Sequence, residues 1–282
     1  ESDRAYEEDI DTAAQIVMDR RSELRLVIIA GPSSSGKTTT TIKLGERLAE
    51  EGVSLVTLNV DNYFFDLELH PKDEFGDYDF ETPQALDLEL INEHLTHLIA
   101  GEEVRIPYYD FKTSIRHDAV TPMRLGANDI LLIDSLHGLY PAMTQDVEDE
   151  QKFTLYIETL LQMKGPDGRM IRWTDLRLMR RMVRDASFRA RDPRQTLEHW
   201  HYVRSSEMRN IIPYANTTDY IINTTTVTDV ITENATGTPQ LPANGSSTKS
   251  LVSVNIRIKY SGISLGKRAG LGSMPCSLQY RK

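Results

Sequence analysis

The sequence predicts an α/β fold in which a doubly wound, mostly parallel sheet carries helices on both faces. Short apolar runs typical of buried strands recur at residues 26–30, 53–60, 130–133 and 153–157. Stretches with the apolar spacing of helices alternate with these runs, and the first run leads straight into a glycine-rich loop. Because ligands of such sheets collect at the carboxyl ends of the strands, we expect the functional site at that edge.

The glycine-rich loop and its flanks predict a nucleotide site. Residues 31–38 read GPSSSGKT, which matches G-x-x-x-x-G-K-[ST], the P-loop of P-loop NTPases. The glycines let backbone N–H groups turn toward phosphate oxygens, and the following helix aims its positive end at the same charge. Lys37 supplies a cation for the β- and γ-phosphates, and the Thr38 hydroxyl is a ligand for Mg²⁺. The predicted phosphate-binding residues are Gly31, Ser33, Ser34, Ser35, Gly36, Lys37, Thr38 and Thr39.

The remaining elements follow in order along the chain. Residues 9–25 have helical spacing and lead into the first strand, and the helix after the P-loop reaches about residue 51. An acidic, turn-rich stretch covers 66–81, and 86–100 reads as an amphipathic helix. The third and fourth strands then complete the alternation, which is typical of parallel βαβ units.

Two aspartates directly follow predicted strands. Asp134 ends the third strand, at the position where P-loop enzymes keep a carboxylate for Mg²⁺. Asp61 ends the neighbouring strand and is a candidate base that orients an acceptor hydroxyl toward the γ-phosphate. The pattern alone leaves structural alternatives open: Asp134 as a cap after its strand, and Asp61 as the start of an Asx turn.

An arginine-rich segment at about 165–195 is unusual in this acidic chain. Arg177, Arg180, Arg181 and Arg184 are spaced i, i+3, i+4 and i+7, so they line one stripe of a helix. One interpretation is a solvated charged face. The preferred one is a helical arginine-rich lid that closes over the nucleotide, because guanidinium groups match phosphate oxygens and neutralise transition-state charge.

Composition narrows the function classes. The formal net charge of −10 argues against non-specific binding to nucleic acid or to an anionic membrane, so the expected partner is a small molecule. The single cysteine, Cys276, excludes an internal disulfide and suits a reducing, cytoplasmic compartment. No apolar run reaches the about 18 residues of a membrane helix. The chain begins at Glu1 rather than Met, as a piece of a longer protein would.

Five motifs, in this order, resemble the uridine kinase and phosphoribulokinase family. They are GPSSSGKTT, DNYF, the block ETPQALDLELINEHLTHLIAGEEVRIPYYDFKTSIR, LLIDSLHGL and TDLRLMRRMVRDASFRARD. The resemblance covers roughly residues 21–223 and is strongest to bacterial uridine-kinase-like proteins, in which a domain shared with threonyl-tRNA synthetases often precedes the kinase domain. It implies transfer of phosphate from ATP or GTP, with Mg²⁺, to the 5′-hydroxyl of a nucleoside, uridine or cytidine first. Relatives often form homo-oligomers.

The resemblance also assigns roles to residues. Asp61 falls on the catalytic base, and Lys37, Arg181 and Arg184 complete the catalytic set, while Arg189 and Arg191 match lid arginines that face the phosphates. The residues that fall in segments of the nucleoside pocket are Tyr63, Phe80, Glu81, Tyr109 and Arg116, although Tyr108 and Tyr109 are equally compatible with core packing. The chain departs from uridine-cytidine kinases at Glu81, Ser114 and His199, which replace an aspartate, a histidine and a glutamine. Phosphoryl transfer is therefore better supported than uridine as the acceptor.

Two other functions remain open. One is phosphorylation of another small alcohol, such as a sugar phosphate, with the arginines holding the phosphate of the substrate. The other is a nucleotide-binding regulator of low turnover. The complete set of Lys37, Asp61, Asp134 and Arg181 favours catalysis, because a pure binding module has little need of an acceptor-side base.

Three segments are expected along the chain. Residues 1–24 form a helix that leads in, 25–223 form the P-loop kinase domain, and 224–282 form an atypical tail. Residues 224–249 are rich in Thr, Ser, Asn and Gly and read as linker or disorder. Residues 251–260 alternate apolar and polar side chains, which predicts one strand that needs a partner.

Overall fold

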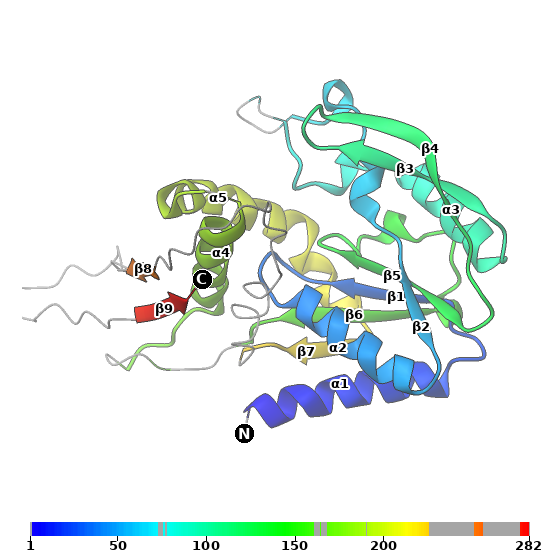
Figure 1. Ribbon diagram of the computed structural model, residues 1–282, viewed down its shortest axis with the longest axis horizontal. Helices are drawn as coiled ribbons and strands as arrows, with labels where there is room; N and C mark the ends of the chain where they lie inside the picture. Colours follow the sequence, from blue (N-terminus) through cyan, green and yellow to red (C-terminus); the bar gives the residue numbers. More distant parts are fainter. Residues whose placement is uncertain are drawn as a thin grey trace, which may run out of the picture. The chain divides into compact units, whose positions relative to one another are not determined.

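The structure of the chain is a computed structural model (Figure 1). It describes residues 2–72, 76, 78–160, 164, 168–189, 191–225, 251–255 and 277–281. The chain divides into two compact units, Glu1–Gly237 and Thr238–Lys282. The first unit holds every candidate site residue, and each unit is described by itself.

The first unit is built on a parallel sheet of five strands in the order β2-β5-β1-β6-β7. These strands are β1 (Leu26–Ala30), β2 (Ser54–Thr57), β5 (Asp129–Ser135), β6 (Lys152–Glu158) and β7 (Tyr220–Asn223). All the pairings between them are parallel, as the alternation of apolar runs and helices predicts. Because β1 lies at the centre, the loop that leaves its carboxyl end is flanked by the ends of β5 and β6.

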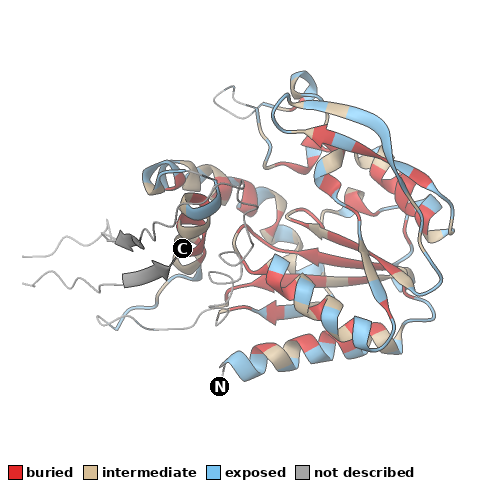
Figure 2. Cartoon of the chain, viewed as in Figure 1, coloured by how far each residue is buried: buried red, intermediate tan, exposed pale blue. Residues whose placement is uncertain are grey.

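Helices cover both faces of the sheet, so the prediction of a doubly wound α/β fold is confirmed. Side chains of β1 alternate between two buried clusters: Val27 and Ile29 pack with α1 and α2, whereas Leu26 and Ile28 pack with α3 and the segments beside it. Figure 1 places α1 and α2 together on one side of the sheet. In Figure 2 the central strands β5, β1 and β6 are red along most of their length, because both of their faces are buried, whereas the edge strands β2 and β7 are largely half-buried or exposed.

The helices agree with the expected ones in place, with shifted ends, except the last, which lies mostly beyond the predicted lid and was not expected. They are α1 (Ser2–Asp19), α2 (Lys37–Glu50), α3 (Leu88–Ile99), α4 (Trp173–Phe188) and α5 (Pro193–Asn210). The first helix begins before the helical spacing that starts at residue 9 and ends before Arg25, and it packs into the same core as α2 rather than only leading in. Asp87 caps α3 by accepting a hydrogen bond from the Leu90 amide at 3.1 Å.

Short 3₁₀ helices make many of the connections. They are η1 (Val60–Tyr63), η2 (Leu67–Leu69), η3 (Pro83–Ala85), η4 (Pro141–Met143), η5 (Asp149–Gln151) and η6 (Ile212–Thr217). The first of them, η1, carries Asp61 and follows β2 directly along the edge of the sheet.

An antiparallel hairpin of β3 (Val104–Asp110) and β4 (Ile115–Met123) was not expected from the residue pattern. Most of β4 is exposed, as the pale blue of this strand in Figure 2 shows. A strand as exposed as β4 needs no alternation of apolar and polar residues, so periodicity gives no signal for it, although β3 is largely buried.

In the second unit, β8 (Leu251–Asn255) pairs antiparallel with β9 (Ser277–Arg281). The strand predicted within 251–260 is therefore present over its first half, and its partner is β9.

The predicted linker at 224–249 lies outside the described residues except for Thr224 and Thr225. Thr224 is buried and belongs to the site, because its hydroxyl donates a hydrogen bond to the Ser35 carbonyl.

Candidate active site

The loop between β1 and α2 depends on glycine at both ends. A Cβ on Gly31 would lie 2.2 Å from the carbonyl oxygen of Ile157 in β6, so no other residue fits without moving the sheet. Gly36 caps α2 at φ 105°, in the left-handed region that favours glycine. Between them, Ser34 takes a φ of 61°. The loop is thus held in the tight curl that turns its amides toward a phosphate.

Lys37 is folded back onto this loop. Its Nζ donates hydrogen bonds to the Gly31 carbonyl at 2.8 Å and the Pro32 carbonyl at 3.2 Å. Burial lowers the pKa of Lys37, an effect that the negative charge of Asp134 partly offsets. Thr38 is exposed at the start of α2 and Thr39 is buried beside it. A strong anion at this loop would therefore find a desolvated cation within reach.

Two carboxyl groups meet near Lys37, as the parallel sheet predicts. Asp134 stands in β5 opposite Ile29 of β1 and accepts a hydrogen bond from the Thr41 hydroxyl at 3.4 Å. Desolvation raises the pKa of Asp134, and Lys37 lowers it. Asp61 is accessible to solvent, yet desolvation by the surrounding protein is the largest effect on its carboxyl and raises its pKa. The negative charge of Asp134 raises the pKa of Asp61 further, and the positive charge of Lys37 lowers it. Both carboxyls therefore share Lys37 as counter-charge.

Glu81 is a third acid at the same place. Its carboxyl lies 4.0 Å from the Arg181 guanidinium, and its main-chain carbonyl is held by Ser206 and Asn210 of α5. Burial raises the pKa of Glu81, whereas the charges of Arg181 and Lys37 lower it. The position where the sequence departs from uridine-cytidine kinases thus faces the catalytic candidates.

Arginines of α4 contact the loop through Ser33. Arg181 donates to the Ser33 hydroxyl at 2.9 Å, and Arg184 donates to the same oxygen at 3.4 Å. Burial, with Arg189 and Arg181 nearby, lowers the pKa of Arg184 to about 10. Arg189 is 52% exposed by side chain and pairs with Asp185 at 3.5 Å. Arg191 is exposed, and its amide donates to the Asp185 carbonyl.

Arg177 differs from the other members of the predicted stripe. It is fully buried, and its Nε lies 3.0 Å from a Glu158 carboxyl oxygen while its two terminal nitrogens bond both oxygens of Glu207. It also donates to the Ser33 carbonyl at 3.1 Å. Its role is therefore to tie β6, α4, α5 and the loop together, and its charge is already neutralised by carboxylates.

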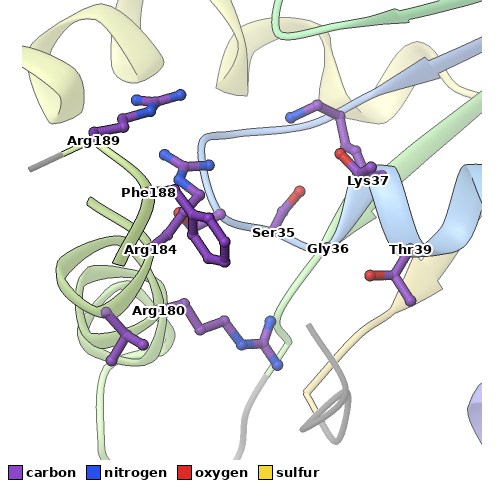
Figure 3. Close-up of a pocket in the computed structure, with 11 residues that line it drawn as sticks. Ser35, Gly36, Lys37, Thr39, Arg180, Arg184, Phe188 and Arg189 are labelled. Atoms are coloured by element: carbon purple, nitrogen blue, oxygen red, sulfur yellow. The ribbon is translucent and has the colours of Figure 1, made fainter. Parts of the chain in front are cut away.

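A cavity of about 260 Å³ opens between the loop and α4. Figure 3 shows Arg180, Arg184, Phe188 and Arg189 on one side of it and Ser35 on the other, with Thr39 and Lys37 at the start of α2. The remaining lining residues are Ser34, Gly36, Thr38 and Val183. The predicted phosphate-binding loop and two of the predicted lid arginines, Arg184 and Arg189, thus enclose one space. Arg191 does not line it.

The predicted acceptor-binding residues are only partly brought together. Phe80 and Tyr109 belong to an aromatic cluster around Phe64, with ring centroids 5.8 Å and 5.5 Å from it. Phe80 is partly exposed and Tyr109 is buried. Arg116, although opposite Tyr109 across the hairpin, is held in ion pairs with Asp87 and Asp118, each at 2.9 Å.

Tyr63 lies elsewhere than expected. Its side chain is fully buried in the core, and its hydroxyl is hydrogen bonded to Nδ1 of His94 at 2.8 Å. A phenol with no exposed surface and a satisfied hydroxyl offers nothing to a ligand in this structure. The family resemblance gave the expectation for Tyr63, but the turn of η1 directs the side chain into the core.

Several residues of the site were missed by sequence reasoning. Glu158 and Glu207 pair with Arg177, and their buried charges carry no local signal in the sequence. His137 is buried, and neither ring nitrogen reaches hydrogen-bond geometry with a described residue. Burial and the charge of Lys37 lower the pKa of His137 to about 4, so its ring is neutral near pH 7. Phe188 was passed over as one apolar residue among arginines.

Comparison with known proteins identifies the family. A family model described as "Phosphoribulokinase / Uridine kinase family" matches residues 26–231, which is most of the chain and includes β1 to β7. The chain belongs to this family. It is accordingly an ATP-dependent phosphotransferase with an α/β P-loop fold.

The match to individual relatives covers most of the length of each relative. A "Uridine kinase" of Deinococcus deserti is 28% identical over 195 residues, covering 69% of this chain and 84% of the relative. A "Uridine-cytidine kinase 2-B" of Danio rerio is 30% identical over 205 residues, covering 70% and 72%. A "Uridine kinase" of Bacillus pumilus is 29% identical over 203 residues, covering 72% and 87%. The chain is thus similar to each of these three proteins over about seven-tenths of its length.

Among the described residues, every helix is too short or too polar to span a bilayer.

Proposed function

We propose that this kinase transfers the γ-phosphoryl group of ATP to the 5′-hydroxyl of a nucleoside, with uridine or cytidine as the first candidates. The observation that carries the proposal is the meeting of Asp61, Asp134 and Lys37 at the end of the P-loop. The names of the relatives from Deinococcus, Danio and Bacillus support a nucleoside as the acceptor.

On this proposal, the donor end of the site works by electrostatics. Lys37 leaves the Gly31 and Pro32 carbonyls for the β- and γ-phosphates, and the loop amides bind the oxygens between them. Arg181 and Arg184 exchange the Ser33 hydroxyl for the transferring phosphoryl group. Arg189 and Arg191 approach the phosphates from the end of α4, in the manner of a lid. These exchanges replace neutral acceptor oxygens by anionic phosphate oxygens, so that both partners of each hydrogen bond are charged.

Magnesium fits the oxygen donors of this site. Mg²⁺ is usually held by one or two carboxylates together with substrate phosphates, and it keeps several waters. Asp134 and the Thr38 hydroxyl are the protein oxygens that we assign to it. The absence of a cluster of three or more metal-binding side chains among the described residues agrees with this kind of site, because the phosphates supply the remaining ligands.

Asp61 is the proposed base on the acceptor side. In phosphoryl transfer its main task is to orient the hydroxyl in line with the γ-phosphate, so its raised pKa is compatible with the role. Glu81, which faces Arg181, is the proposed partner for a sugar hydroxyl, and the partly exposed Phe80 offers an aromatic face for the base, whereas Tyr109 is buried in the same aromatic cluster. Tyr63 and Arg116 remain predictions that their observed contacts with His94, Asp87 and Asp118 do not support.

The proposal is tested by ADP release from Mg·ATP with a panel of acceptors, including uridine, cytidine, purine nucleosides and ribulose 5-phosphate. Asp61→Asn should lower turnover at least about a hundredfold while ATP binding survives. Glu68→Gln, which alters an exposed carboxylate of η2, is the matched control and should leave turnover unchanged. Selective acceleration by the sugar phosphate would replace the nucleoside as acceptor, and full activity of Asp61→Asn would remove Asp61 from the mechanism.

A further inference from the structure

An exposed aromatic ring lies at the mouth of the phosphate loop. Phe188 is the last residue of α4, is 50% exposed, and lines the cavity opposite Ser35 and Gly36. Single exposed apolar residues are ordinary on protein surfaces. This one differs because it faces a cavity whose other walls are arginines and the phosphate loop, as Figure 3 shows.

The direction in which a triphosphate lies along the loop determines which part of a nucleotide reaches the Phe188 ring. The γ-phosphate belongs at the end where Lys37, Asp61 and Asp134 meet, because the transfer occurs there. Lys37 lines the cavity, but neither Asp61 nor Asp134 is among the described residues that line it, so the transfer end lies beyond the Lys37 side of the cavity. A triphosphate laid along the loop from the Lys37 amine therefore carries its ribose and base toward the part of the cavity that Phe188 lines.

The size and chemistry of the cavity suit a base. Its volume of about 260 Å³ is below the roughly 300–1,000 Å³ of pockets that enclose whole drug-sized ligands, so it houses one part of a nucleotide. The flat face of an aromatic ring stacks on any nucleobase. No carboxylate or side-chain amide is among the described residues that line the cavity, so arginines and hydroxyl groups are the side chains there that can reach the edge of a base.

We propose that Phe188 stacks on the base of the donor nucleotide, so that the kinase holds its donor by ring stacking as well as by contacts to the phosphates. The inference rests on the proposed function for the presence of a donor nucleotide at this loop. It adds a donor-binding residue at the end of the arginine helix.

Calorimetric titration of the full chain separates the base from the phosphates. The probes are Mg·ATP, Mg·GTP and Mg·tripolyphosphate, the last of which has phosphates but no base. Phe188→Ala should weaken ATP and GTP roughly five- to a hundredfold and leave tripolyphosphate unchanged, since this is the usual range for losing one stacked aromatic. Phe188→Tyr keeps the ring and should restore nucleotide affinity. Trp173→Ala, at the other end of α4 and 44% exposed, is the matched control.

Each outcome decides between the two proposals. Equal affinity of the unaltered protein for ATP and tripolyphosphate would overturn the stacking contact and leave the kinase function standing. An equal loss of ATP and tripolyphosphate affinity in Phe188→Ala would also overturn it, because the ring would then act on the phosphates. ATP that failed to bind at all would overturn the proposed function and the contact together.

Discussion

Arg177→Met removes a buried guanidinium that joins four parts of the fold and keeps a side chain of similar length. Two carboxylates then lose their main counter-charge: Glu158, whose side chain is 3% exposed, and Glu207, which is 2% exposed. Glu207 retains its ion pair with Arg204, but Glu158 keeps only neutral donors such as the Thr159 amide. Removing one member of a buried ion pair typically costs about 3–5 kcal/mol, so we expect a loss of that size in the free energy of unfolding.

Urea unfolding followed by circular dichroism measures this loss, with Arg47→Met as the control. Arg47 also pairs with two carboxylates, Glu7 and Asp11, but its side chain is 35% exposed, so the control should lose less than about 1 kcal/mol. Burial already raises the pKa of Glu158 and Arg177 opposes the rise, so without Arg177 the buried carboxyl is more easily protonated. The loss should therefore be larger at pH 8 than at pH 5.5. A loss similar to that of Arg47→Met, or one independent of pH, would refute the reasoning.

Three further predictions concern the loop and the acids. The folded-state pKa of Asp61 is raised, so the charged carboxylate destabilises the fold at pH values above that pKa. Asp61→Asn should therefore raise the melting temperature at pH 7. A lower melting temperature of this variant would contradict the desolvation of the carboxyl. The charge of Asp134 contributes to the raised pKa of Asp61, so the acid limb of the kcat/KM profile should lie above the ordinary Asp range. This limb should move to lower pH in Asp134→Asn. A limb that did not move would show that another group, and not Asp61, causes it. Gly31→Ala should abolish ATP binding in titrations because of the Ile157 carbonyl, whereas Gly45→Ala, with open space in α2, should stabilise the fold by about 0.5–1 kcal/mol in urea.

The fold class was predictable because its signals are local. An apolar run such as 26–30 can be buried on both faces only in the middle of a sheet, and the P-loop pattern fixes the turn that follows it. The hairpin of β3 and β4 was not predictable from periodicity, since it is held by pairing across the strands while β4 stays largely exposed. The partner of β8 was equally hidden, because β9 begins more than twenty residues later.

The candidate site was predictable where a residue sits at the end of a strand. Asp134 could be placed from its run of apolar neighbours alone, and the parallel sheet brings Asp61 to the same edge. Tyr63 could not be placed, because one turn of η1 decides whether its ring faces a ligand or the core. Arg177 shares its spacing with Arg181 and Arg184, and only the positions of Glu158 and Glu207 separate it from them.

By itself, the sequence determined the P-loop α/β fold, because strand, loop and helix follow from neighbouring residues, and its motifs placed the chain in the kinase family by resemblance. Only the tertiary structure decided that Arg177 is held by the buried carboxylates Glu158 and Glu207, whereas Arg181 and Arg184 contact the loop through Ser33. It also decided that Phe188 lines the cavity at the loop and that Tyr63 is buried in the core. The physical reason is that burial and charge pairing depend on residues far apart in the chain, which no local pattern brings together.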